Sequence, residues 1–184
     1  MSIGVKLLSG YRVSGQAQYL CYTTDRVNGK LDNAFAVLND FPGYQRSWRL
    51  TEYKGSDPGV DSYYSLEALD TARDGMPPNP DPATYWKYAA WFLCLIGDAV
   101  VLSPVGQIDD THQIDQSVAY WRMGTYTDPN GNSFQRFQPI NYPGGNLSPN
   151  LDGDDRPDRQ HPVGIRDNVP SKAAGAMDFY FESI

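Results

Sequence analysis

Short apolar or alternating stretches, separated by Gly, Pro, Asn and Asp, recur along the chain. Successive side chains of a strand point to opposite faces of a sheet, and clusters of turn-forming residues end strands. Alternation is clearest in residues 16–24, 46–53 and 176–184. Asn28-Gly29 is a pair favoured in tight hairpin turns, and residues 33–39 supply a partner strand for residues 16–24. The pattern predicts a β-rich chain.

Two further hairpins are expected in the second half of the chain. Residues 83–105 are apolar on both faces, so periodicity alone does not separate a helix ending at Gly97 from a hairpin. The Gly97-Asp98 pair between two apolar runs favours the hairpin. Residues 117–127 and 133–142 flank a stretch of turn-forming residues, which predicts another hairpin.

Two segments depart from this pattern. Tyr63, Leu66 and Leu69 recur at helical spacing after a capping residue, which predicts one short helix over residues 62–73. Residues 141–172 contain several prolines and little apolar periodicity, which predicts a long Pro- and Asp-rich surface loop. No repeat of fixed period is evident along the sequence.

The predicted fold is mainly β, with residues 1–184 forming a single antiparallel sandwich or jelly-roll domain. A chain of 184 residues buries roughly 70% of the surface of its unfolded form, so it folds without needing a metal or a disulfide. The aromatic share of 13% argues against disorder. We therefore expect one packed core.

Charge and apolar patterning exclude several classes of function. The formal charge is −7 and the isoelectric point is about 4.6, so we expect no nucleic-acid partner. We also expect no membrane span and no signal peptide, because the apolar runs are too short, and we expect the protein in the cytoplasm or in an assembled particle. Cys21 and Cys94 lie in apolar surroundings and predict two buried thiols.

Residues 150–158, NLDGDDRPD, carry a candidate metal site. Asn150, Asp152, Asp154 and Asp158 occupy relative positions 1, 3, 5 and 9, and all four offer short oxygen ligands of the kind that Ca²⁺ prefers. Gly153 permits the sharp turn that such a loop needs. The alternative is a solvated loop whose aspartates pair with neighbouring arginines.

Over these nine residues the stretch resembles the calcium loop of thrombospondin type-3 repeats. By that resemblance, Asn150, Asp152, Asp154 and Asp158 would be the calcium ligands. The sixth position is Asp155 where that family usually has glycine, and the neighbouring repeat with paired cysteines is absent. The resemblance implies a calcium site and nothing about the overall fold.

Other candidate sites come from aromatic and histidine side chains. Trp86, Tyr126 and Tyr142 are candidates to stack on sugar rings, although large aromatic side chains more often belong to a core. His112 or His161 beside the aspartates could act as general acid and base in a hydrolase, but no catalytic motif surrounds either histidine.

Three functions follow from these observations, in order of preference. The first is a non-enzymatic structural or interaction protein that self-associates as a homo-oligomer into a particle, appendage or inclusion. The second is a calcium-dependent, lectin-like module that binds a glycan. The third is a hydrolase that uses paired aspartates.

Overall fold

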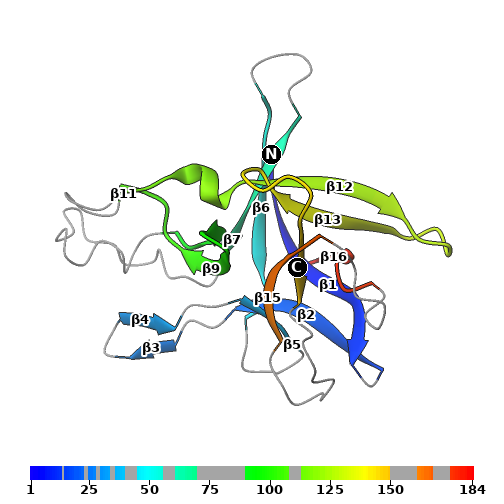
Figure 1. The fold of residues 1–184 in the computed structure, drawn as a ribbon. Coiled ribbons are helices and arrows are strands. Elements are labelled where there is room, and N and C mark those ends of the chain that lie inside the picture. The colour runs from blue at the N-terminus through cyan, green and yellow to red at the C-terminus, as the bar shows by residue number, and fades with distance from the viewer. Residues whose placement is uncertain are drawn as a thin grey trace.

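The computed structural model describes residues 1–13, 15–22, 25–27, 30–33, 36–39, 45–55, 61–69, 90–107, 113–149, 161–167 and 175–184. Within these residues the chain forms short strands and a short 3-10 helix, η2 (Figure 1). The elements are β1 Ser2–Val13, β2 Gln16–Tyr22, β3 Asp25–Val27, β4 Lys30–Asn33, β5 Ala36–Asn39, β6 Trp48–Tyr53, β7 Tyr63–Ala68, β8 Phe92–Ile96, β9 Ala99–Ser103, β10 Gly106–Gln107, β11 Gln113–Ile114, η2 Gln116–Ala119, β12 Trp121–Thr127, β13 Ser133–Pro139, β14 Asn146–Pro149, β15 His161–Arg166 and β16 Phe179–Ser183.

Six strands close a ring. β1 pairs with β6, β6 with β7, β7 with β12, β12 with β13, β13 with β16, and β16 pairs again with β1, all antiparallel. Val5 lies opposite both Trp48 of β6 and Ser183 of β16, so β1 has partners on both sides. In Figure 1, β1 (blue) and β16 (red) accordingly lie side by side. Every strand of the ring therefore has two neighbours.

Three hairpins follow alternate strands of this ring. The hairpin β2–β5 follows β1, β8–β9 follows β7, and β14–β15 follows β13. Neighbouring strands of the ring are antiparallel, so β1, β7 and β13 run in the same direction and their hairpins gather at one end. The second strands of the hairpins meet there, because β15 pairs with β5 and both contact β9.

The chain is thus built from three lobes with the same order of elements. The first lobe is β1, β2, β5 and β6, the second is β7, β8, β9 and β12, and the third is β13, β14, β15 and β16. A six-stranded ring covered by three hairpins in this order has β-trefoil topology. The mainly antiparallel β class predicted from the sequence is confirmed, and the ring refines the expected sandwich.

Equivalent side chains recur in the lobes, although the sequence shows no obvious repeat. Trp48, at the start of β6, donates its indole Nε1–H to the carbonyl oxygen of Leu20 at 2.9 Å. Trp121, at the start of β12, donates to Leu93 at the same distance. In each pair the tryptophan lies 28 positions after the leucine, and the second pair lies 73 positions after the first. The first two lobes thus share a spacing of 73 positions, which the third lobe does not keep.

The core lies inside the ring and beneath the hairpins. Trp48, Trp121 and Phe179 each begin the last strand of a lobe, and all three are fully buried. Burying side chains of this size stabilises the fold more than any single polar contact. The largest fully buried side chains are Trp48, Trp121, Tyr22, Phe137, Phe179, Leu7, Leu20, Leu66, Leu93, Leu147 and Met177.

Several predicted elements are confirmed. The hairpin favoured over a helix forms as β8–β9, and Gly97 in its turn has a φ of +64°, a backbone conformation that suits glycine. β12 and β13 form the second predicted hairpin. Val27 pairs with Lys30, and β2 pairs with β5, whereas the predicted turn residues Asn28 and Gly29 lie outside the described residues. Residues 83–89 lie outside the described residues.

The predicted helix over residues 62–73 is wrong in the described part, where residues 63–68 form β7. β7 is covered on both sides in the sheet, and Ser65, Leu66, Glu67 and Ala68 are all buried. Burial on both faces of a strand removes the alternation by which a strand is recognised. The spacing of Tyr63, Leu66 and Leu69 then imitated a helix.

The predicted surface loop over residues 141–172 also needs correction. β14 and β15 pair antiparallel within it, with Leu147 opposite Ile165. Leu147 and Ser148 are fully buried, so this part of the segment belongs to the core. Prolines stand inside or beside both short strands, which obscured the pattern. Residues 150–160 and 168–172 lie outside the described residues.

Two further expectations concern thiols and membranes. Cys21 and Cys94 are buried and no disulfide joins them, as predicted. Among the described residues, no helix combines the length and the apolar character that crossing a membrane requires.

Candidate functional site

The predicted calcium ligands lie outside the described residues. This holds for Asn150, Asp152, Asp154 and Asp158, and also for the candidate sugar-stacking residue Trp86. Within the part of the chain that the structure describes, no three His, Cys, Asp or Glu side chains are grouped so as to hold a metal ion. The calcium site therefore stays a prediction.

Tyr126 lies near the tip of the hairpin β12–β13 and is 47% exposed. Its ring stacks on Phe134 with centroids 5.5 Å apart, and the Arg136 guanidinium lies 5.1 Å from the ring centroid. Arg136 is itself held by an ion pair of 2.7 Å with Asp178. Part of the Tyr126 ring is thus committed to packing within the protein.

Tyr142 follows β13 and is 48% exposed. Its ring lies against Gly145, where a side chain would collide with it. In the hairpin register, Tyr126 lies opposite Phe134 close to the turn, whereas Tyr142 comes after Pro139 at the other end. The two tyrosines therefore do not form one site.

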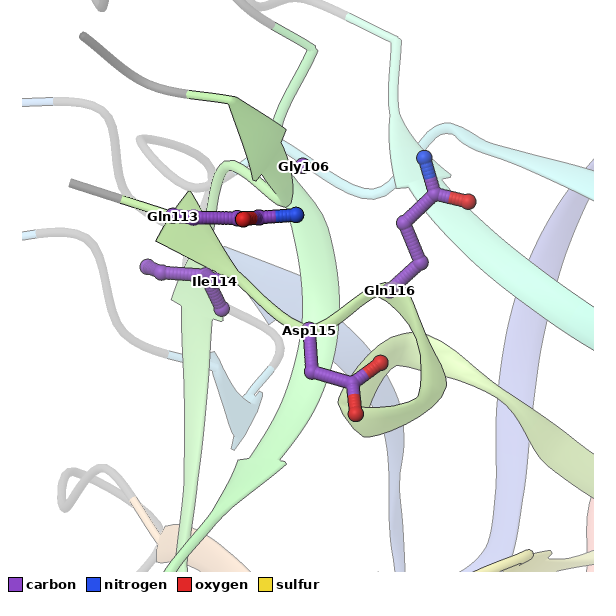
Figure 2. A pocket seen from close by; sticks show the side chains of 5 residues that line it. All are labelled: Gly106, Gln113, Ile114, Asp115 and Gln116. Carbon is purple, nitrogen blue, oxygen red and sulfur yellow. The ribbon is translucent and has the colours of Figure 1, made fainter. Parts of the chain in front are cut away.

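The sequence did not predict a cleft that is formed in the second lobe by the segment connecting β9 to β12. The strands β10 and β11 pair to form a small two-stranded sheet, and η2 follows immediately. The cleft has a volume of about 570 Å³. Figure 2 shows Gly106 between Gln113 and Gln116, with Asp115 on the lower side. Its lining residues are Gly106, Gln113, Ile114, Asp115 and Gln116.

Local hydrogen bonds hold the polar groups of the cleft in place. Asp115 is the N-cap of η2, where its Oδ1 accepts from the backbone N–H of Ser117 at 2.9 Å. No described residue donates a hydrogen bond to the other oxygen, Oδ2. Gln116 accepts from the Tyr120 hydroxyl through Oε1 at 3.2 Å, which leaves its Nε2 as a donor.

Gly106 keeps the middle of the cleft open. Its φ is +85°, in the region that favours glycine. A Cβ at this position would lie 3.4 Å from Nε2 of Gln116. A larger side chain at residue 106 would therefore fill the space beside the Gln116 amide.

Tyr120 contacts Gln116 at the edge of the cleft, and two further tyrosines, Tyr53 and Tyr63, pack against Tyr120. Tyr53 ends β6, Tyr63 begins β7 and Tyr120 precedes β12. Their ring centroids lie 4.6–5.4 Å apart, and all three rings are half-buried. Burial raises the pKa of Tyr120 above its usual 10, and Tyr53, Tyr63 and Asp115 raise it further. The Tyr120 hydroxyl therefore keeps its proton at neutral pH and remains a donor to Gln116.

The chemistry of the cleft suits a neutral, hydrogen-bonding ligand. Gln113, Asp115 and Gln116 are exposed, and together they offer amide donors, amide acceptors and a carboxylate acceptor. Asp115 is the one formally charged side chain among the five described lining residues, and its negative charge disfavours phosphate and other anions beside it. A few polar groups in a concave site usually set the orientation of a ligand.

The fold and the cleft define a β-trefoil domain with a polar cleft in its second lobe. No family model and no curated protein matches the chain. In structure, the chain is similar to part of a mosquitocidal holotoxin, with a TM-score of 0.60 and 9% identity, over 100% of this chain and 17% of the toxin chain. It is also similar to a Caenorhabditis elegans protein with unknown function, with a TM-score of 0.51 and 11% identity, over 98% of this chain and 93% of that one. Identities this low show a shared fold alone.

Proposed function

We propose that the protein is a non-enzymatic binding module that takes a neutral, hydroxyl-rich ligand, a carbohydrate, in the cleft of its second lobe. The observation that carries the proposal is the placement of Gln113 and Gln116 on either side of Gly106, with the Asp115 carboxylate beside them. Neighbouring hydroxyl groups of a sugar act as donor and acceptor at once. Amide and carboxylate groups pair with both roles.

The similarity to a mosquitocidal holotoxin supports a modular role. This chain corresponds to 17% of the toxin chain, so the same fold occurs there within a much longer protein. A compact domain of this kind commonly contributes recognition to a larger protein, while the site decides what is recognised.

A glycan array with cleft variants tests the proposal. We expect the wild-type protein to bind neutral glycans, and Gln113→Ala and Asp115→Asn to lower the affinity about tenfold. Asparagine at residue 115 keeps an oxygen that can cap η2 but removes the carboxylate charge. Tyr142→Ala, outside the cleft, serves as the control and should bind as the wild type does. Absence of glycan binding, or equal binding by the cleft variants, would contradict the proposal.

Calcium dependence is a separate part of the lectin-like prediction. If Asn150, Asp152, Asp154 and Asp158 bind Ca²⁺, millimolar calcium should raise the melting temperature by binding the native state. The double variant Asp152→Ala, Asp154→Ala should show no such rise. An unchanged melting temperature in the wild type would remove calcium from the proposal and leave the cleft untouched.

Self-association is the second candidate function, and exposed apolar side chains favour it. Met1, Ile3 and Ile184 are 83%, 42% and 56% exposed. Ile184 lies over Gly4, so the three residues lie at the same end of the ring, where β1 begins and β16 ends. Apolar surface of this kind is a common feature of interfaces between copies. Sedimentation should show an oligomer that the Ile3→Ser, Ile184→Ser variant dissociates; a monomeric wild type would exclude this function.

A further inference from the structure

The three tyrosines beside the cleft form an aromatic surface with a fixed geometry. Tyr53 and Tyr63 stack with an interplanar angle of 9° and centroids 5.3 Å apart. Tyr120 is tilted by 43° against Tyr63 and by 47° against Tyr53. The hydroxyl of Tyr53 is paired with Ser65 at 3.3 Å. Contacts among the rings and this hydrogen bond therefore hold the surface in place without a ligand.

A purely structural cluster would be expected to be buried. Tyrosines of the core of this protein, such as Tyr22, are fully buried, whereas Tyr53, Tyr63 and Tyr120 each keep part of the side chain in solvent. They come from the last strand of the first lobe, the first strand of the second lobe and the residue before β12. The surface therefore lies at the junction of two lobes.

The tyrosine surface is continuous with the cleft. The Tyr120 hydroxyl donates to Gln116 Oε1 at 3.2 Å, and Gln116 is a lining residue of the cleft. Figure 2 shows the Gln116 side chain directed away from Asp115. One side chain thus belongs to the polar cleft and also contacts the aromatic surface. A ligand that extends past Gln116 would meet tyrosine rings next.

The cleft and the tyrosine surface complement two different parts of a sugar chain, its hydroxyl groups and its C–H faces. The cleft offers hydrogen bonds to hydroxyl groups, whereas aromatic rings offer contact to the C–H face of a pyranose. An acidic peptide would find no cationic partner among the described cleft residues. A chain of linked pyranoses presents both kinds of group to adjoining positions.

We infer that Tyr53, Tyr63 and Tyr120 form a second subsite that stacks on a further pyranose ring of the carbohydrate held in the cleft. The preferred ligand is accordingly an oligosaccharide of two or more rings. This inference depends on the proposed function, because it names the ligand class of the same site and the residues that select for length.

The test compares sugars of increasing length against matched variants. Two series of probes are used: galactose with lactose, and glucose with maltose and maltotriose. Calorimetry on the full chain measures the affinity for each sugar. The variants are Tyr63→Ala, which removes a ring, and Tyr63→Phe, which keeps the ring and removes the hydroxyl. Tyr126→Ala removes an exposed ring elsewhere. Circular dichroism and melting curves confirm that each variant is folded.

We expect the wild type to bind at least one of the longer sugars more tightly than the corresponding monosaccharide. Tyr63→Ala should lower the affinity for the longer sugar by about five- to tenfold and change that for the monosaccharide by less than about twofold. Tyr63→Phe and Tyr126→Ala should bind as the wild type does.

The outcomes separate this inference from the proposed function. If the longer sugars bind no more tightly than monosaccharides, or if Tyr63→Ala leaves the length preference unchanged, the second subsite is wrong and the cleft stands. If no probe binds the wild type, the carbohydrate proposal and the subsite both fail. If Tyr63→Ala lowers the affinity for the monosaccharide as much as the affinity for the longer sugar, the tyrosine supports the structure of the cleft and the subsite is excluded.

Discussion

Two tryptophans in equivalent positions hold the hairpins of the first two lobes to the ring. Trp48 and Trp121 are fully buried, and each indole N–H donates to a leucine carbonyl on the first strand of the hairpin. Each indole N–H thereby finds an acceptor in the core, as a buried polar group requires. In the third lobe Phe179 takes the same place, and a phenyl ring offers no such donor.

Replacing either tryptophan should destabilise the protein. Trp48→Phe or Trp121→Phe removes the hydrogen bond to the leucine carbonyl and part of the buried ring, which should cost about 1–3 kcal/mol in the free energy of unfolding. Urea denaturation measures the change. Tyr142→Phe, at an exposed position, is the control and should change stability by less than about 0.5 kcal/mol. Equal stability of the tryptophan variants and the wild type would show that these bonds contribute little.

The Cys94 thiol gives a pH dependence with a definite sign. Burial raises the pKa of Cys94 from 9.0 to about 12, although a hydrogen bond with the Ser103 backbone lowers it in part. The native state therefore keeps a proton that the unfolded chain releases above about pH 9. Stability should be unaffected below pH 9 and should fall between pH 9 and 12, by about 1.4 kcal/mol per pH unit.

Denaturation of the wild type and of Cys94→Ser over this pH range checks the expectation. Serine occupies the equivalent position in the third lobe, as buried Ser148, and does not titrate there. The difference in unfolding free energy between the two proteins should shrink as the pH rises above 9. A constant difference up to pH 11 would contradict the raised pKa.

The residue pattern contained a repeat signal that the strand rhythm concealed. Leu20-Cys21 and Leu93-Cys94 are 73 positions apart, and so are Trp48-Arg49 and Trp121-Arg122. The third lobe keeps only Leu147 at the first place and has Phe179 at the second. Few residues are shared between the lobes, because most buried positions of the ring require only an apolar side chain of suitable size, and many residues satisfy that requirement.

At the scale of elements, the turn of the β12–β13 hairpin depends on Asp128. Its Oδ1 accepts from the backbone N–H groups of Asn130 and Asn132, and its Oδ2 accepts from the Tyr180 hydroxyl at 3.2 Å. These bonds connect the turn to β16 as well as closing it. The hydrogen bonds, chiefly those from Asn132, lower the pKa of Asp128 below its usual 3.8.

Asp128→Asn should lower the melting temperature at neutral pH and not at low pH. Because the pKa of Asp128 is lower in the native state, the ionised carboxylate stabilises the fold above about pH 4. This stabilisation is lost as the carboxylate is protonated at lower pH. The gap in melting temperature between wild type and variant at pH 7 should therefore narrow by pH 3. A gap that is the same at both values would show that charge has no part in the effect.

The hairpins were the elements that the sequence predicted best. Turn chemistry is local, so Gly97-Asp98 and the stretch 128–132 indicated their turns without knowledge of the fold. β7 was wrongly predicted as a helix because strands from other parts of the sequence surround it: β6 lies on one side, and β12 and β8 lie on the other. Pairing on both sides with burial on both faces erased the pattern on which the strand assignment depended.

At the scale of the molecule, the candidate site belongs to one lobe. Asp115 and Gln116 stand six and five residues before Trp121. At the same distances before Trp48 the sequence has Pro42 and Gly43. Before Phe179 it has Ala173 and Ala174. The side chains that make the cleft polar are therefore confined to the second lobe.

We expect one carbohydrate bound per chain. Calorimetry with the tightest-binding sugar should give a stoichiometry of one, because the other two lobes lack a carboxylate and an amide at the matching positions. Asp115→Asn should weaken that one event without revealing a second. A stoichiometry of two or three would show that other lobes bind by different side chains.

The candidate site was harder to predict than the fold. Gly106 and Gln113 come together only because β10 pairs with β11, strands of two residues each that carry almost no periodic signal. Tyr53 and Tyr63 join Tyr120 only when the ring brings two lobes together. Asp115 as a helix cap was the one local clue to the site.

Closure of the ring also determines when the protein can fold during its synthesis. β16 is synthesised after the other five strands of the ring, and it fills the gap between β1 and β13. Until it emerges, a nascent chain has two unpaired strand edges that can join a neighbouring polypeptide. Closure of the ring thus waits for synthesis of β16, which makes the interval before β16 pairs the period of greatest risk of misassembly.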